Sequence, residues 1–304
     1  MKLGFVSAIL PDQSLEQVFH TAADMDYDCV EIMCWPKGKV ERRYAGVTHL
    51  NVANLSDQDI ETVQQLEQET GVFISGLGYY PNPLASDLQQ SQTYIDHIYK
   101  LIDAAVATDI RFVNTFIGRD PKKTIDENWA RVKAIWQTIM SYAEANEVYV
   151  SIENCPMLFT EDEWPGGLNL GTTPAIWDRL FNDIPSDFWG INFDPSHYII
   201  QRMDYVETIE AYHERFHHIH AKDARIDHKA LNYHGAFSYP NLWHEPKLPG
   251  MGDVDWGKFF SALTSVGYDG PVCVEVEDRA YEGSLDKQHR ALLQSYNYLR
   301  QWVV

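Results

Sequence analysis

The chain has 304 residues, of which 45% are hydrophobic and 22% are charged, as in an ordinary globular protein. Its formal net charge of −20 argues against nucleic acid or an anionic membrane as the main partner, because both are negatively charged. The four cysteines form no C-x-x-C pair, so neither a zinc ribbon nor a redox motif is indicated. The first apolar run breaks too soon for a signal peptide, and no window approaches the roughly 18 apolar residues of a membrane span. We therefore expect a cytoplasmic protein.

Short apolar runs alternate with longer segments of helical period along the whole chain. The runs expected as strands are residues 3–9, 29–35, 72–78, 110–116, 148–154, 188–194, 217–223 and 271–277. The segments expected as helices are residues 14–25, 56–71, 86–108, 124–146, 172–183, 205–216, 255–267 and 283–303. Eight alternating units predict an α/β fold, a closed (β/α)₈ TIM barrel, as a single domain over residues 1–304. The alternative is a doubly wound open sheet, but the G-x-G pieces here lack the strand–turn–helix context of its nucleotide-binding turn.

The later expected strands place polar residues on the face that a barrel turns inward. Successive side chains of a strand point to opposite faces, so Glu153 and Ser151 face one way while Val150 and Ile152 face the other. The same alternation gives further inward residues: Asn192, Asp194, His218, His220, Lys222, Glu275 and Glu277. Bulky aliphatic residues normally fill a barrel interior. Polar residues in this half therefore indicate a site.

The carboxyl ends of these strands supply four groups: Glu153, Asp194, His220 and Glu275. Active sites of such barrels lie at this end, where neighbouring strands are about 4.8 Å apart. Three carboxylates that close raise one another's pKa unless a cation compensates them. Three oxygen ligands and one nitrogen ligand suit one divalent ion, in the first place Mn²⁺, with Mg²⁺, Co²⁺ or Zn²⁺ as alternatives.

Other interpretations of these residues stay open at this point. A glutamate at a strand end can form a structural ion pair with Lys222 or Arg225. Glu31, on the inward face of the second expected strand, is either a core hydrogen-bonding group or a substrate contact. The metal site is favoured because four groups fall together on consecutive strand ends.

The segments "SIEN", "NFDPSH", "HIHAKDAR", "LPGMGDVDW" and "VCVEVED" resemble the xylose-isomerase-like TIM-barrel superfamily of sugar isomerases and epimerases, the AP-endonuclease-2-like family. The resemblance covers essentially the whole chain and is strongest after Tyr149. It implies a metal held by four ligands: Glu153, Asp194, His220 and Glu275. The two glutamates would double as the catalytic acid/base pair, and His197 and Arg225 would hydrogen-bond substrate oxygens. The extra histidines of the DNA-cleaving endonuclease IV branch are missing from the second and third strand ends here.

The chemistry that the resemblance implies is proton abstraction next to a carbonyl, through an enediolate. Return of the proton to the other face gives an epimer, and return to the next carbon gives an aldose–ketose isomer. We therefore expect a metal-dependent sugar or cyclitol isomerase or epimerase. The first alternative is a dehydratase or lyase acting on a keto-sugar or keto-glycoside, including one that works as a subunit of a complex. The second is a non-catalytic sugar-binding barrel.

Residues 225–253 form a segment too long for a plain connection, and its aromatic content argues against disorder. We expect a lid over the barrel mouth that selects the substrate, with Trp243, His244 and Lys247 as candidate contacts. The alternative is a contact in a homo-oligomer. Aromatic residues just after earlier strands either stack on a sugar ring or equally serve as packing: Trp35, Tyr79 and Tyr80.

Overall fold

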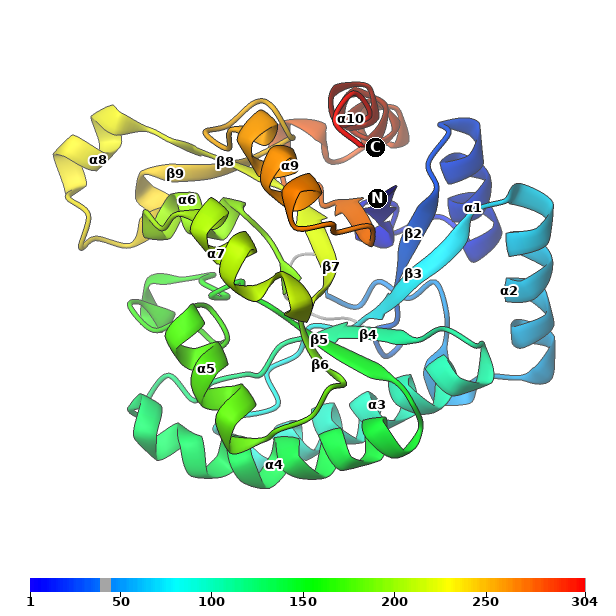
Figure 1. The fold of residues 1–304 in the computed structure, drawn as a ribbon, viewed down its shortest axis with the longest axis horizontal. Helices are drawn as coiled ribbons and strands as arrows, with labels where there is room; N and C mark the ends of the chain where they lie inside the picture. Colours follow the sequence, from blue (N-terminus) through cyan, green and yellow to red (C-terminus); the bar gives the residue numbers. More distant parts are fainter. Residues whose placement is uncertain (39–44, 304) are drawn as a thin grey trace.

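Eight parallel strands close into a barrel in the order β1-β10-β7-β6-β5-β4-β3-β2 (Figure 1). The structure, a computed structural model, describes residues 1–38 and 45–303. The barrel strands are β1 (Lys2–Val6), β2 (Cys29–Met33), β3 (Phe73–Gly78), β4 (Phe112–Thr115), β5 (Tyr149–Glu153), β6 (Trp189–Phe193), β7 (Phe216–Ala221) and β10 (Pro271–Val274). The predicted TIM barrel is therefore confirmed. The predicted domain, residues 1–304, includes residues 39–44 and 304, which lie outside the described residues.

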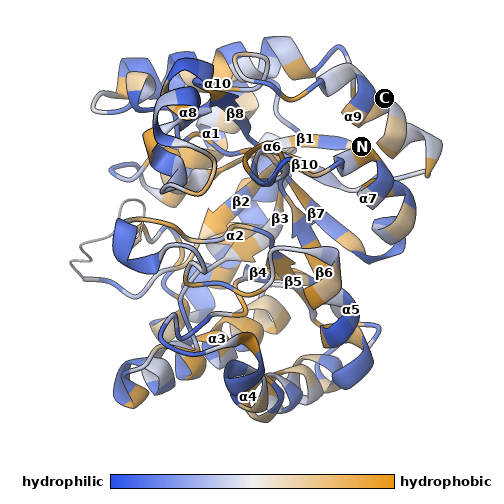
Figure 2. Ribbon diagram, turned by 90° about the vertical axis from the view of Figure 1, so that its left-hand side faces the viewer, coloured by the Kyte–Doolittle hydropathy of each residue, from blue (hydrophilic) through white to orange (hydrophobic). Residues whose placement is uncertain are grey.

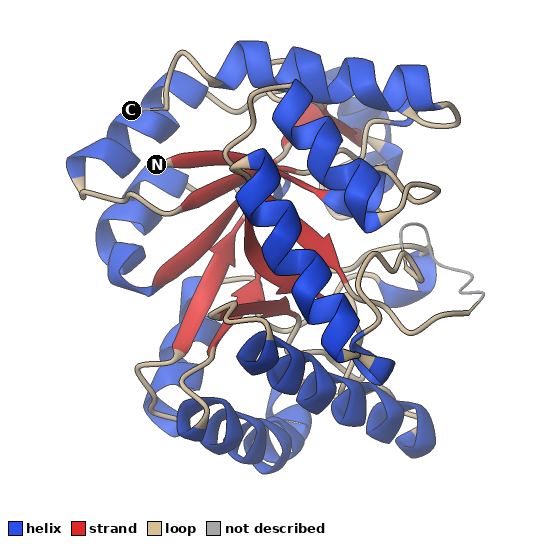
Figure 3. Ribbon diagram, turned by 90° about the vertical axis from the view of Figure 1, so that its right-hand side faces the viewer, coloured by secondary structure: helices blue, strands red, loops and turns tan. Residues whose placement is uncertain are grey.

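Helices surround the strands on the outside of the barrel (Figure 3). They are α1 (Leu15–Asp24), α2 (Asp57–Thr70), α3 (Leu88–Ala107), α4 (Ile125–Ala145), α5 (Pro174–Asp183), α6 (Ser196–Gln201), α7 (Tyr205–Tyr212), α8 (His228–His234), α9 (Trp256–Ser265) and α10 (Leu285–Leu299). Capping boxes at Ser14, Ser56 and Thr124 fix the starts of α1, α2 and α4, since each side chain satisfies a backbone N–H that the helix leaves free. Among the described helices, none combines the length and the apolar character that crossing a bilayer requires.

The apolar core lies between the strands and the helices. Ile152, Ile191 and Phe193 point outward from β5 and β6 and are fully buried. Trp136 of α4 packs on Trp189 with ring centroids 5.2 Å apart. Burial of each large apolar side chain contributes about 1.5–3 kcal/mol, so this layer holds the helices on the barrel. Figure 2 shows much of the hydrophobic colour on the strands and much of the hydrophilic colour on the outer helices and loops.

The inside of the barrel is polar, as the alternation predicts. Glu31, Asn192, His218 and His220 are fully buried there. The register between β6 and β7 shifts between Ile191 and Asn192, which places Asn192 beside His218. The shift lets the two inward side chains meet, and His218 Nδ1 lies 3.1 Å from Asn192 Oδ1.

The segment predicted as a lid is folded into regular elements. β8 (Asp223–Ile226) pairs antiparallel with β9 (His244–Lys247), and α8 and the 3₁₀ turn Pro240–Leu242 lie between them (yellow to light orange in Figure 1). The carboxylate of Asp223 anchors both ends of this segment, because it accepts hydrogen bonds from the backbone N–H groups of Ala224, Gly250 and Val254 and from Trp256 Nε1. Whether the segment acts as a lid stays a prediction.

Candidate active site

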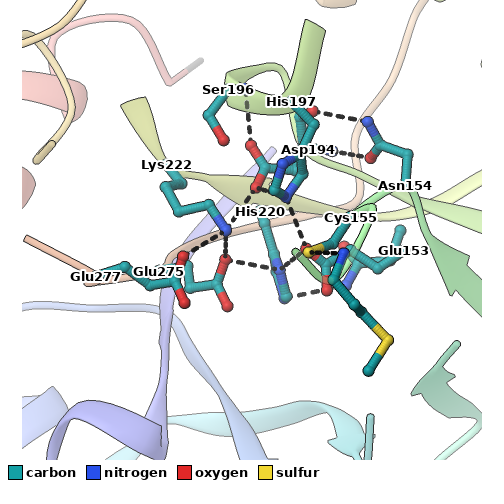
Figure 4. Close-up of polar contacts among 12 residues, drawn as sticks. Glu153, Asn154, Cys155, Asp194, Ser196, His197, His220, Lys222, Glu275 and Glu277 are labelled. Carbon is teal, nitrogen blue, oxygen red and sulfur yellow. Dashed lines mark hydrogen bonds and ion pairs between the residues drawn. The ribbon is translucent and has the colours of Figure 1, made fainter. Parts of the chain in front are cut away.

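The four predicted ligands converge at the carboxyl end of the barrel (Figure 4). Glu153 ends β5, Asp194 follows β6, His220 lies on β7 and Glu275 follows β10. His220 Nδ1 is 3.7 Å from Glu153 Oε1 and 3.5 Å from Glu275 Oε2. His197, in the first turn of α6, bridges Asp194 and Glu153, with Nε2 3.1 Å from Asp194 Oδ2 and 3.4 Å from Glu153 Oε1.

Three of the ligand atoms are buried and form no hydrogen bond: Glu153 Oε1, Asp194 Oδ2 and His220 Nδ1. Asp194 Oδ2 has the Lys222 ammonium at 3.0 Å as an ion-pair partner, but Glu153 Oε1 and His220 Nδ1 have only looser contacts. A buried polar atom without a hydrogen bond costs about 1–3 kcal/mol, so such atoms are rarely left together unless something binds them. Glu153, His220 and Glu275 each offer a ligand atom, and these atoms lie within 4.8 Å of one another. The residues present therefore fit a divalent cation.

Asp194 is held in place by its neighbours in two ways. The Ser196 N–H donates to Asp194 Oδ1 at 2.8 Å, which leaves Oδ2 turned into the site. The side chain of Asn154 bonds the backbone of Asp194 on both sides, with Nδ2 donating to the carbonyl at 2.9 Å and Oδ1 accepting from the N–H at 2.7 Å. The carboxylate is thus fixed before any ligand binds.

Glu31 sets the orientation of His220. Its Oε2 lies 2.7 Å from His220 Nε2, and its Oε1 accepts a hydrogen bond of 2.5 Å from the Tyr80 hydroxyl. A proton on Nε2 that is donated to Glu31 leaves the Nδ1 lone pair facing Glu153 and Glu275, as a metal ligand requires. Burial by itself would raise the pKa of Glu31, but His220 outweighs it and lowers this pKa to about 2. The sequence marked Glu31 as inward but gave no sign of this partner on the far side of the barrel.

Lys222 is the second residue whose role the sequence left open. Its buried ammonium Nζ lies 3.0 Å from Asp194 Oδ2, 2.5 Å from Glu275 Oε2 and 3.1 Å from Glu277 Oε2. Burial opposes the charge, yet these carboxylates hold the pKa of Lys222 well above its usual value. The ion-pair alternative is therefore present in the structure beside the metal-ligand geometry. One ammonium does not balance three carboxylates, so the cluster remains attractive to a further cation.

Two connected chambers meet at this cluster, and Cys155, Phe159, Lys222 and Glu277 line both. The inner chamber has a volume of about 70 Å³, and its largely apolar wall includes Trp35, Tyr80 and Phe116. The outer chamber has a volume of about 620 Å³ and extends under the β8–β9 hairpin. A reacting group bound at Glu153 and Glu275 would lie on the inner side, next to the aromatic wall.

Some of the other predicted substrate contacts line the two chambers, and others do not. Trp35 lines the inner chamber, and His244 and Lys247 line the outer one. Tyr79 is fully buried and packs edge-on against Trp35, with ring centroids 4.8 Å apart, so it supports the wall from behind. Trp243 is buried inside the predicted lid and lines neither chamber.

Arg225 is not brought to the cluster. Its side chain is 53% exposed and pairs with Glu245, which is directly opposite in the β8–β9 register. The physical reason is the hairpin itself, since alternate residues of β8 face opposite ways and only its buried face meets the barrel. A substrate contact by Arg225 would need this hairpin to rearrange.

Comparisons with known proteins agree with the fold. The uncharacterized protein YfiH of Bacillus subtilis strain 168 is 24% identical over an alignment of 304 residues that covers 91% of this chain and 93% of that protein. An inosose dehydratase of Geobacillus thermodenitrificans is 28% identical over 113 residues, 36% of this chain and 38% of that protein.

Solved structures of low identity match over nearly the full length. The IOLI protein with a zinc atom aligns with a TM-score of 0.70 and 16% identity, covering 99% of each chain. The 3-keto-D-glucoside 4-epimerase YcjR of E. coli aligns with a TM-score of 0.70 and 18% identity, also covering 99% of each chain. The family model of the xylose isomerase-like TIM barrel matches residues 19–302, and the chain therefore belongs to this family, as its motifs indicate.

Proposed function

We propose that this chain is a divalent-metal-dependent isomerase or epimerase that moves a proton next to the carbonyl of a sugar or cyclitol. The observation that carries the proposal is the convergence of Glu153 Oε1, Asp194 Oδ2, His220 Nδ1 and Glu275 Oε2, three of them buried without a hydrogen bond. The low-identity neighbours named for sugar epimerisation and for bound zinc support it.

The ligand set favours Mn²⁺, with Mg²⁺, Co²⁺ and Zn²⁺ as alternatives, because it offers three carboxylates and one imidazole. A bound dication would act as a Lewis acid that polarises the substrate carbonyl. A metal ion at these ligands would displace the Lys222 ammonium from Asp194 Oδ2 and Glu275 Oε2. The ammonium could keep its ion pair with Glu277 Oε2, at 3.1 Å.

The two glutamates are placed to move the proton. Glu153 ends β5 and Glu275 follows β10, and these strands flank β6 and β7 in the barrel order, so the two glutamates approach the centre of the site from different sides. Glu153 takes the proton from the carbon next to the carbonyl, and Glu275 delivers a proton to the other face or to the neighbouring carbon. His197 is 6% exposed, and its Nε2 faces Asp194 Oδ2 at 3.1 Å, but its Nδ1 is buried without a hydrogen bond and is available to hold a substrate oxygen.

Hydrogen exchange with the solvent tests this proposal directly. The protein is stripped with a chelator, reloaded with Mn²⁺ and incubated with a panel of keto-sugars in D₂O, and deuterium bound to carbon is followed by NMR. We expect Mn²⁺-dependent incorporation that Glu153→Gln lowers at least ~100-fold, the usual contribution of a general base. The exposed Glu207→Gln serves as the matched control. Absence of bound metal, together with equal rates in wild type and Glu153→Gln, would refute the proposal.

A dehydratase or lyase is the second candidate, favoured by the partial match to inosose dehydratases. After the same proton abstraction by Glu153, a β-hydroxyl or glycosidic oxygen leaves with its bonding electrons and takes up a proton from Glu275. The D₂O experiment separates the two, because elimination yields water or an alcohol and an unsaturated product. An epimerase returns a saturated sugar that carries deuterium.

A further inference from the structure

The outer chamber is larger than one sugar ring requires. Liquid water takes about 30 Å³ per molecule, and a hexose has about a dozen non-hydrogen atoms at closer spacing, so it fills less than about 360 Å³. The outer chamber alone has about 620 Å³, within the range of clefts that hold larger ligands. Because the inner chamber has only about 70 Å³, a ring that reacts at the cluster must extend into the outer chamber, and roughly half of the combined space would still be left to solvent.

The walls of the outer chamber combine apolar and hydrogen-bonding groups. Met157, Leu158 and Phe159 form an apolar side on the segment after β5, and Asn241 and His244 lie on the predicted lid. The His244 Nδ1 hydrogen is donated to the Pro240 carbonyl at 2.8 Å, which leaves Nε2 to accept a hydrogen bond. Such walls suit a sugar unit or an aromatic group, which present an apolar face and a polar edge.

The charges around this chamber favour a neutral occupant. Lys247 Nζ lies 2.9 Å from Glu245 Oε2 and 3.5 Å from Asp278 Oδ2, and Lys222 is shared among three carboxylates. A phosphate here would meet Glu245, Glu277 and Asp278; the two lining lysines are already paired with these carboxylates, which leaves Arg279, at the exposed rim, as the remaining cation of the described lining. The repulsion between these carboxylates and a dianion disfavours a phosphorylated substrate.

We propose that the substrate is an uncharged keto-sugar carrying a bulky neutral substituent, a glycoside, whose ring reacts at Glu153 and Glu275 while its substituent occupies the rest of the outer chamber. This inference rests on the proposed function, because it places the reacting ring at Glu153 and Glu275. It selects one class among the keto-sugars that the cluster alone would accept.

The test compares matched ligands on the Mn²⁺-loaded protein. The panel is 3-keto-glucose, its methyl and phenyl β-glycosides, its 4-linked glucosyl disaccharide and its 6-phosphate, with dissociation constants from calorimetry and kcat/KM from deuterium incorporation or product formation. Calorimetry on Glu153→Gln gives binding without turnover. We expect the phenyl glycoside or the disaccharide to bind at least ~10-fold more tightly than free 3-keto-glucose, and the phosphate to bind more weakly than either.

A variant that fills the chamber connects this preference to the structure. Ala280 is exposed and lines the outer chamber, so Ala280→Trp should lower the glycoside-to-free-sugar ratio of affinities at least ~10-fold. Ala107→Trp, at the exposed last residue of α3 before the amino end of β4, is the matched control and should leave the ratio unchanged.

The outcomes separate the two proposals. If free 3-keto-glucose or the phosphate is bound and turned over as well as the glycosides, and Ala280→Trp does not change the ratio, the inference is wrong while the proposed function stands. If no member of the panel reacts, calorimetry on Glu153→Gln still decides the inference: a preference for glycosides that Ala280→Trp removes supports it, and no such preference overturns it.

Discussion

Replacement of Lys222 by methionine tests the balance of charge at the centre of the site. The change keeps the unbranched shape of the side chain, shortened by one atom, and removes a buried ammonium that contacts Asp194 and Glu275 at 3.0 and 2.5 Å. Removal of one partner from a buried ion pair costs about 3–5 kcal/mol, because the remaining charges are left uncompensated in a desolvated place. We expect the metal-free Lys222→Met protein to lose about this much of its free energy of unfolding.

A dication at the four ligands should reverse much of that loss. It would compensate the same carboxylates, and it would no longer compete with the ammonium for Asp194 Oδ2 and Glu275 Oε2. By linkage, each ~1.4 kcal/mol of stability recovered on adding Mn²⁺ equals a tenfold tighter binding of the ion relative to wild type. Lys222→Met should therefore be less stable without metal and bind Mn²⁺ more tightly, by about tenfold or more.

Urea unfolding with chelator and with saturating Mn²⁺, together with a calorimetric Mn²⁺ titration, measures both quantities. Lys258→Met is the control, because Lys258 forms an exposed pair with Asp255 on α9 and its loss should leave both results unchanged. Unaltered stability of metal-free Lys222→Met would show that the ammonium does not compensate the cluster. Equal Mn²⁺ affinity in variant and wild type would show that the ion binds elsewhere.

Three further changes probe the support of the site. Glu31→Gln should weaken Mn²⁺ binding about 10–100-fold in a metal titration, since the amide no longer fixes the His220 proton as the carboxylate does; unchanged affinity would contradict that role. Asp223→Asn keeps one accepting oxygen, that of the amide, and leaves two of four donors facing an NH₂ group, at about 1–3 kcal/mol each, so the midpoint of urea unfolding should fall and residues 228–243 should be cleaved sooner in limited proteolysis. Burial and the nearby Arg215 lower the pKa of His217 from 6.5 to about 4, so below pH 6.5 the unfolded chain binds a proton that the folded chain refuses. Stability should fall by up to roughly 3 kcal/mol between pH 6.5 and pH 4, and His217→Phe should flatten that part of the curve; an unchanged slope would refute the assignment.

The alternation of side chains was sufficient to predict the barrel and the inward direction of Glu153, Asp194, His220 and Glu275. Strand period is a local property, and the carboxyl ends of neighbouring parallel strands meet whatever the loops do. The convergence of these side chains could thus be expected from sequence.

Contacts across the barrel and within the predicted lid were beyond the reach of local patterns. Glu31 meets His220 from strands that are not neighbours in the barrel order, and the sequence named Lys222 as an ion-pair partner without showing which carboxylates it contacts. Arg225 turns away because β8 pairs with a strand about twenty residues later, a register that depends on tertiary packing. Sequence therefore anticipates which groups face the axis but not how each is partnered.

The double hydrogen bond between Asn154 and the backbone of Asp194 has a consequence for how such a protein can change. The amide continues the ladder between β5 and β6 by one rung after the strands themselves have ended. The backbone of Asp194 thus takes its position from the barrel and does not depend on residues 155–159, the segment that follows Asn154. Residues 155–159, which line the outer chamber, are therefore free to accept insertions and replacements during evolution while the position of Asp194 stays the same.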